Sequence, residues 1–137
     1  MHEGRDLDLW LGQFIKARGG VAGTVHRRVE EALELASSVN IPDKVIALTR
    51  HIPRGKGMAG LAFERDRPVT TCNLQTDKSG DVKPGARAVN AEAAVALPVH
   101  DSDGAIRAIV GIAFPDERDF GDDVLASLMQ DVESMPK

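Results

Sequence analysis

The clearest candidate for chemistry is the segment Gly55-Lys56-Gly57-Met58-Ala59-Gly60, which spells G-x-G-x-x-G. Glycines at this spacing occur where backbone amides wrap the phosphates of a nucleotide. A dinucleotide turn also needs a crossover helix, about a dozen residues or more, before the next parallel strand. Only residues 61–67 separate Gly60 from Pro68, and Lys56 is not followed by the Ser or Thr of a Walker loop. The segment therefore does not predict a nucleotide enzyme.

The same glycines have a structural explanation that needs no ligand. Gly55 and Gly57 can adopt positive φ at low cost, as a tight turn requires. Gly60 lets the short helix predicted at 58–65 approach the sheet closely, and Pro68 ends that helix. An anion site at this helix N-terminus is the alternative, but a turn with a solvated Lys56 is the favoured interpretation.

A second group of candidates follows the short strand predicted at 69–74. Its members are polar or nucleophilic and cluster at the strand end: Cys72, Asn73, Gln75, Thr76 and Asp77. They precede a long connection, 75–91, and loops of this length in a compact domain are usually functional or mobile. We expect these residues to be ligand-binding if the connection covers a pocket.

The residues do not assemble a catalytic or metal centre. Cys72 is the single cysteine, which excludes an intramolecular disulfide and a multi-cysteine zinc site. A lone strand cysteine is usually an inert small hydrophobe, and no cation that would lower its pKa can be identified. His26, His51 and His100 are dispersed without metal-binding spacing. We therefore expect a non-enzyme with no metal and no cofactor.

The strongest hairpin signal is Asp101-Ser102-Asp103-Gly104, between strands predicted at 93–100 and 105–114. One face is bulky and carries Val95, Leu97, Val99, Ile106, Val110, Ile112 and Phe114. The opposite face is small and carries Ala94, Ala96, Ala105, Gly111 and Ala113, with His100 and Arg107. The small face predicts a closely packed helix, or alternatively a pocket under the loop 75–91. His100 and Arg107 are candidate ligand-binding residues of that pocket.

Hydrophobic periodicity predicts the other elements. Two alternating strands are expected at 24–29 and 32–37, and 42–50 favours a short helix over a strand. Longer helices are expected at the two ends of the chain, over 5–18 and 121–134, with apolar stripes at helical spacing. The expected order is a helix, two strands, short helices, a strand, a hairpin and a final helix. This order predicts one α+β domain, residues 1–137, with an antiparallel sheet.

Bulk composition fits one globular domain. The chain has 137 residues, with 42% hydrophobic and 28% charged residues, enough to bury a core. Its net charge of -4 argues against nucleic-acid or membrane partners. No export signal and no apolar run of roughly 20 residues are visible, so a cytoplasmic location is expected.

Taken together, the motifs resemble those of the GAF domain family. The resemblance is carried by Ile52-Pro53-Arg54-Gly55-Lys56-Gly57-Met58-Ala59-Gly60, Pro68-Val69, Asn73 and Asp77, Ala96-Leu97-Pro98-Val99, the strand 108–113, and Phe120-Gly121-Asp122-Asp123. It covers nearly the whole chain. It implies a GAF/PAS-like antiparallel sheet of about six strands, with the terminal helices on one face and a ligand pocket on the other.

The resemblance implies a sensory or signalling role. The first hypothesis is a non-catalytic domain that binds a small molecule and docks a protein partner. The second is an interaction module without ligand, pairing as a homodimer through the terminal helices, with Trp10 near the interface. An enzyme like the free methionine sulfoxide reductases of the family is disfavoured, because Cys72 has no resolving cysteine.

Overall fold

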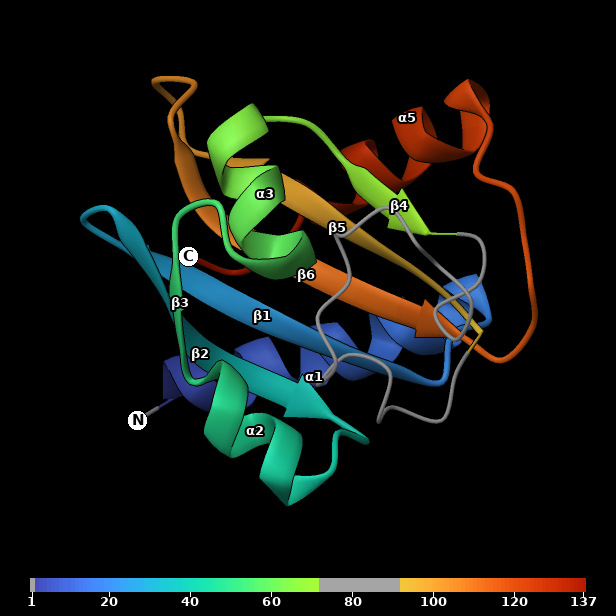
Figure 1. The fold of residues 1–137 in the computed structure, drawn as a ribbon, viewed down its shortest axis with the longest axis horizontal. Coiled ribbons are helices and arrows are strands. Elements are labelled where there is room, and N and C mark those ends of the chain that lie inside the picture. Colours follow the sequence, from blue (N-terminus) through green and yellow to red (C-terminus); the bar gives the residue numbers. More distant parts are fainter. Residues whose placement is uncertain (1, 72–91) are drawn as a thin grey trace.

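The computed structural model describes residues 2–71 and 92–137. Its centre is a six-stranded antiparallel sheet of order β3-β2-β1-β6-β5-β4 (Figure 1). The strands are β1 (Ala22–Val29), β2 (Ala32–Val39), β3 (His51–Pro53), β4 (Val69–Thr71), β5 (Ala93–His100) and β6 (Ile106–Phe114). The predicted α+β class with a six-stranded antiparallel sheet is confirmed.

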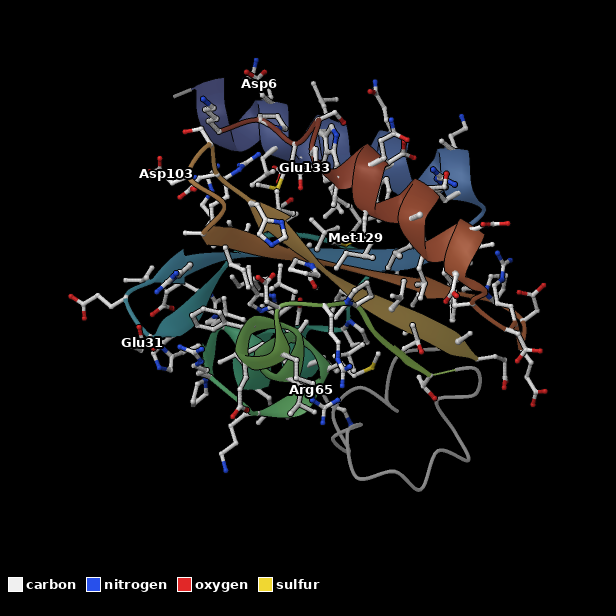
Figure 2. All side chains as sticks on the ribbon, turned by 90° about the horizontal axis from the view of Figure 1, so that it is seen from above. Asp6, Glu31, Arg65, Asp103, Met129 and Glu133 are labelled. Carbon is white, nitrogen blue, oxygen red and sulfur yellow. The ribbon has the colours of Figure 1, made fainter. Side chains whose placement is uncertain are left out.

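The helices cover the two faces of the sheet. Helices α1 (His2–Arg18) and α5 (Asp122–Val132) lie together on one face, as predicted for the terminal helices (Figure 2). Helices α2 (Asp43–Thr49) and α3 (Gly57–Arg65) lie on the other face. The two terminal helices are joined by a salt bridge between Arg18 and Asp131 and by a hydrogen bond from Trp10 Nε1 to Ser134 Oγ of 3.0 Å.

The main core lies between the sheet and the terminal helices. Helix α1 buries one stripe of apolar side chains, which are Leu7, Leu11, Phe14 and Ile15. Helix α5 adds Leu128 and Val132, and both pack against the bulky face of β5 and β6. The chain turns out of α1 at Gly19, whose φ of +76° is a conformation that glycine adopts without strain. The predicted helical stripes are confirmed for these residues, whereas Val124 in the first turn of α5 is 46% exposed.

The β5–β6 hairpin carries the alternation that separates the two faces. Val95 pairs with Ile112 and Leu97 with Val110, and all four side chains are buried against α1 and α5. Between them, Ala96 pairs with Gly111 and Ala94 with Ala113, which face the opposite side. The sequence-based assignment of these residues to a bulky and a small face is confirmed.

A register shift at the hairpin end changes the faces of two residues. Val99 pairs with Ala108 but His100 pairs with Ile106, so Arg107 is an extra residue in β6. Ile106 then packs with Phe63 of α3, while Arg107 reaches the C-terminal segment on the α1/α5 side. The prediction that Ile106 shares the bulky face and Arg107 the small face is wrong, because strict alternation ignores the bulge.

The ambiguous segment after Pro42 contains a helix and a strand. The predicted short helix is confirmed as α2, and it is followed directly by the three-residue edge strand β3. Ile52 of β3 pairs with Leu33 of β2. A strand of this length has no measurable alternation, so periodicity could not reveal it.

The glycine motif forms the predicted tight turn. Gly55 and Gly57 have φ of +84° and +67°. The Gly55 amide donates to the Gly60 carbonyl at 2.9 Å, and the Lys56 amide donates to the Pro53 carbonyl at 3.1 Å. A Cβ at Gly60 would lie 2.7 Å from the Pro53 carbonyl oxygen. The motif thus packs α3 tightly against the end of the edge strand β3.

This contact predicts a cost for any side chain at position 60. Gly60→Ala should lower the free energy of unfolding by about 2 kcal/mol through overpacking against backbone, although alanine is the better helix former. The measurement is urea unfolding followed by circular dichroism. Gly12→Ala is the control, because no atom lies within 4 Å of a Cβ there, and it should stabilise α1 by up to about 1 kcal/mol. Equal effects at the two positions would contradict the steric explanation.

Candidate functional site

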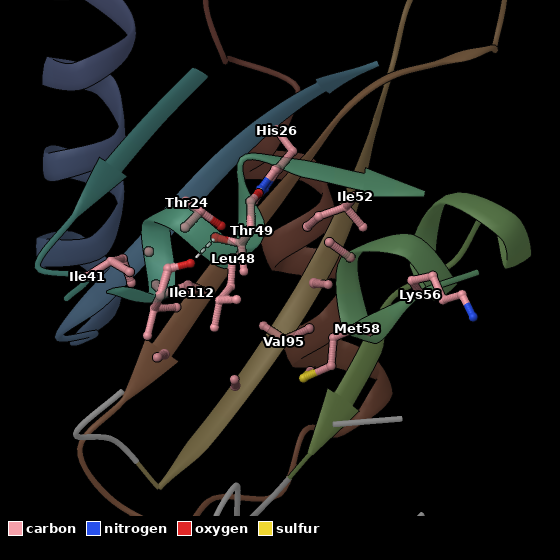
Figure 3. Close-up of a pocket in the computed structure, with 18 of the residues that line it drawn as sticks. Thr24, His26, Ile41, Leu48, Thr49, Ile52, Lys56, Met58, Val95 and Ile112 are labelled. Atoms are coloured by element: carbon pink, nitrogen blue, oxygen red, sulfur yellow. Dashed lines mark hydrogen bonds between the residues drawn. The ribbon is translucent and has the colours of Figure 1, made fainter. Parts of the chain in front are cut away.

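A cavity of about 450 Å³ lies between the sheet and the helices α2 and α3 (Figure 3). Its floor comes from strands β1, β5 and β6, and its walls come from α2, β3 and the start of α3. The lining residues are Gly23, Thr24, His26, Ile41, Val45, Leu48, Thr49, His51, Ile52, Pro53, Lys56, Gly57, Met58, Ala59, Ala94, Val95, Ala96, Gly111, Ile112 and Ala113.

The small face of the hairpin creates this space. Ala94, Ala96, Gly111 and Ala113 all line the cavity, and the bulky side chains of the same strands point toward α1 and α5. A Cβ at Gly111 would lie 3.0 Å from Thr24 Oγ1. The absence of a side chain at Gly111 therefore leaves space above this part of the floor. Helix α3 covers only part of the face, where Phe63 and Ala62 pack with Ala96 and Ile109. The small face therefore carries a packed helix over one part and a pocket over another, while the predicted cover of the pocket by the loop 75–91 lies outside the described residues.

His26 is a buried titratable group in the described lining of the cavity. It lies on β1, it is 2% exposed, and its Nε2 is 2.7 Å from the carbonyl oxygen of Thr49, the last residue of α2. A carbonyl oxygen only accepts hydrogen bonds, so Nε2 carries the proton in the neutral ring. Nδ1 is then an acceptor, and it is buried without a hydrogen-bond partner among the residues that the structure describes. His26 thus holds α2 to the sheet through one nitrogen and leaves the other unused.

Burial lowers the pKa of His26 from its ordinary value of 6.5. The hydrogen bond to the Thr49 carbonyl and the negative charge of Glu34 act in the opposite direction, but burial is the larger effect. The imidazole is therefore neutral at pH 7, because desolvation disfavours the charged ring.

Besides His26, the polar side chains of the lining are Thr24, Thr49, His51 and Lys56, and Thr24 Oγ1 lies above Gly111 on the floor. Thr49 Oγ1 donates to the Val45 carbonyl at 2.8 Å, within α2. His51 is exposed, and its Nδ1 is 2.8 Å from Glu34 Oε1. The Lys56 side chain extends away from the other labelled residues in Figure 3. The interior formed by the described residues is thus mainly apolar.

His100 does not line this cavity. Its Nε2 is 2.6 Å from Asp66 Oδ1, at the C-cap of α3, and its Nδ1 is 3.7 Å from Glu133 Oε1, at the end of α5. The side chain therefore joins elements from the two faces of the sheet. Its predicted ligand-binding role stays a prediction, at a place separate from the cavity.

Arg107 does not line the cavity either. Its guanidinium donates to the carbonyl oxygens of Met135 at 2.8 Å and Pro136 at 3.3 Å. These bonds satisfy backbone acceptors after the end of α5. The remaining predicted site residues, Cys72, Asn73, Gln75, Thr76 and Asp77, and the loop 75–91 lie outside the described residues.

Sequence reasoning missed His26 as a site residue. Alternation along the strand places Thr24, His26 and Arg28 on one side, which is the side that faces α2 and α3. The sequence gives no reason to bring that side to the small face of the hairpin. The β1–β6 pairing, in which Thr24 lies opposite Gly111, provides this connection.

Within residues 2–71 and 92–137, no group of three or more His, Cys, Asp or Glu side chains could hold a metal ion. No helix in the same ranges is long and apolar enough to cross a membrane.

The fold and cavity define an α+β domain with a ligand-sized space between an antiparallel sheet and two short helices. The protein-family model for the GAF domain matches residues 10–132. The chain belongs to the GAF domain family, as the sequence motifs predicted. No curated protein matches the chain.

Solved structures agree with this fold. The GAF domain of A. aeolicus nlh2 in an inactive state has a TM-score of 0.69 at 20% identity, over 95% of this chain and 77% of that one. A GAF domain of a phosphoenolpyruvate-protein phosphotransferase from Coxiella burnetii has a TM-score of 0.71 at 16% identity, over 94% and 81%. Free methionine-R-sulfoxide reductase from Neisseria meningitidis, solved with its substrate, has 0.69 at 16% identity, over 96% and 76%.

The lowered pKa of His26 predicts a loss of stability in acid. Because the folded pKa lies below 6.5, the unfolded chain binds more protons between the two values, so the free energy of unfolding falls as pH decreases below about 6.5. Urea unfolding at pH 7.5 and 5.5 measures this loss. His26→Gln should lose less stability than the wild type over that interval. Equal losses in wild type and His26→Gln would contradict the assignment.

Proposed function

We propose that this GAF domain is a non-catalytic sensory domain that binds a small molecule in the cavity between the sheet, α2 and α3. The observation that carries the proposal is the cavity itself. Its volume of about 450 Å³ falls within the range of roughly 300–1,000 Å³ that is typical of ligand sites. A mainly apolar lining with few polar groups is also typical of such sites.

The geometry offers a route from ligand to partner. Lys56, Gly57, Met58 and Ala59 line the cavity at the start of α3, and the C-cap of the same helix, Asp66, contacts His100. His100 also lies next to Glu133, at the end of α5. We propose that occupancy of the cavity changes the position of α3 and thereby the surface around α5, where a partner in the cytoplasm docks.

A role as a dimerisation or interaction module is the second candidate. Leu9 on α1 is 58% exposed, and Val124 on α5 is 46% exposed. Exposed apolar side chains on the two terminal helices favour a protein contact on that side, with a second copy of the chain or another protein. Leu128 is buried in the core, so variants at Leu9 and Val124 test this surface without opening the core.

The absence of catalysis is proposed from the sequence. The chain has one cysteine, Cys72. When thiols reduce a sulfoxide, two thiols are oxidised to a disulfide, so a second thiol is needed besides the first. The similarity to a free methionine-R-sulfoxide reductase is at 16% identity and supports the shared fold only.

Filling the cavity should abolish ligand retention. Ala94 lies in the floor, and Ala94→Leu adds three carbon atoms to it. We expect native mass spectrometry of freshly purified protein to show a bound small molecule on the wild type and at least tenfold less on this variant. Ala105→Leu, at an exposed hairpin position, is the matched control and should retain the molecule. A wild type without any bound molecule, or equal retention in all three proteins, would contradict the proposal.

The non-catalytic assignment has its own test. The protein is incubated with free methionine-R-sulfoxide and dithiothreitol, and methionine is quantified by chromatography. We expect methionine at the rate of the protein-free control for both wild type and Cys72→Ser. Turnover by the wild type that Cys72→Ser abolishes would establish an enzyme and overturn this part of the proposal.

A further inference from the structure

The two helices that wall the cavity are attached to the sheet to different extents. Helix α3 buries Gly60, Ala62 and Phe63, and the last two pack with residues of β5 and β6. Helix α2 buries one residue, Val45. A segment with few buried apolar contacts opens at a lower free-energy cost than the rest of a domain. Of these two walls, α2 is therefore the one that opens more easily.

The local structure of α2 does not compensate for this weak attachment. The helix has seven residues, and Pro42 at its N-cap makes no side-chain capping hydrogen bond. Leu48 lines the cavity but remains 71% exposed. A helix of this length is unstable without contacts to the rest of the protein. The position of α2 thus depends on Val45 and on the bond between His26 Nε2 and the Thr49 carbonyl.

The chain is fixed to the sheet on both sides of α2. Before the helix, Asn40 Nδ2 donates to the Val21 carbonyl at 2.9 Å, and the Asn40 backbone has a φ of +60°. After the helix, the Leu35 amide donates to the Arg50 carbonyl at 2.8 Å. The segment between these two points can therefore move outward in its middle while both ends stay in place.

We propose that α2 is the movable wall of the cavity. Residues 41–49 move away from the sheet as a unit while α3 stays packed on it, and small molecules pass to the cavity floor through this opening. Ile41 moves with α2, and because it packs against Ala113 of the floor, the opening exposes Ala113. The inference deepens the proposed function and rests on it for the role of the cavity.

A single thiol on the cavity floor reports the opening without a ligand. Ala113 lines the cavity and is 8% exposed, and Ala113→Cys combined with Cys72→Ser places the only thiol there. Its reaction with methyl methanethiosulfonate is followed by mass spectrometry, at urea concentrations below the unfolding transition. We expect labelling at least about tenfold slower than in the unfolded chain, at a rate independent of urea, because a short segment exposes little surface when it opens.

Two further substitutions, each added to this reporter, distinguish the two walls. Val45→Ala removes two carbon atoms from the buried side chain of α2, and Ala62→Gly removes one from a buried side chain of α3. Both lower the stability of the whole domain. We expect Val45→Ala to raise the labelling rate in the absence of urea about tenfold, and Ala62→Gly to leave that rate unchanged.

Three results would overturn the inference. The first is an equal or larger increase in rate with Ala62→Gly, which would assign the opening to α3. The second is a labelling rate that rises with urea as steeply as global unfolding does. The third is a reporter that reacts as fast as the unfolded chain, since the floor would then be accessible without any opening.

Hydrogen exchange of the wild type covers the case in which the reporter does not fold. The Ile46 amide, which donates to the Pro42 carbonyl at 3.0 Å, should exchange through an opening that is independent of urea. Amides inside α3 should exchange at least about tenfold more slowly and only through urea-dependent opening. Equal protection of the two helices overturns the movable wall. If native mass spectrometry still detects a retained molecule in that case, the proposed function stands.

Discussion

The central strands β5 and β6 carry their large side chains toward α1 and α5 and their small ones toward α2 and α3. Sheet geometry imposes this division, because successive side chains point to opposite faces. Val95, Leu97 and Val110 complete the main core, while Ala94 and Gly111 leave the cavity on the reverse side. The stability of the domain and the room for a ligand therefore depend on the same alternation, and a shift of register by one residue would destroy both.

Much of the fold could be predicted from local sequence patterns. The terminal helices, the hairpin and the glycine turn are coded by local signals that tertiary contacts reinforce. Three features were beyond that reasoning. The strand β3 is too short for a pattern, the bulge at Arg107 breaks the alternation that locates side chains, and His26 joins the cavity only through the pairing of β1 with β6. All three depend on contacts between residues distant in the chain.

The candidate site shows the same limit in functional terms. The polar residues predicted to bind a ligand at the strand end, 72–77, lie outside the described residues, and the described part of the cavity is mainly apolar and includes the buried His26. His100 and Arg107 were predicted as ligand-binding residues of the small face, and neither lines the cavity. His100 lies between the carboxylates of Asp66 and Glu133, and Arg107 donates to carbonyl oxygens after α5. A polar residue on an apolar face can therefore serve to connect two structural elements as well as to bind a ligand.

The shortness of β3 also affects how the protein behaves at high concentration. An exposed sheet edge can recruit a strand from another molecule, and this risk grows with the number of free backbone groups. The β3 edge has three residues, and Pro53 has no N–H to offer. The β3 edge is therefore a poor template for strand addition by a second molecule, and this disfavours aggregation through that edge.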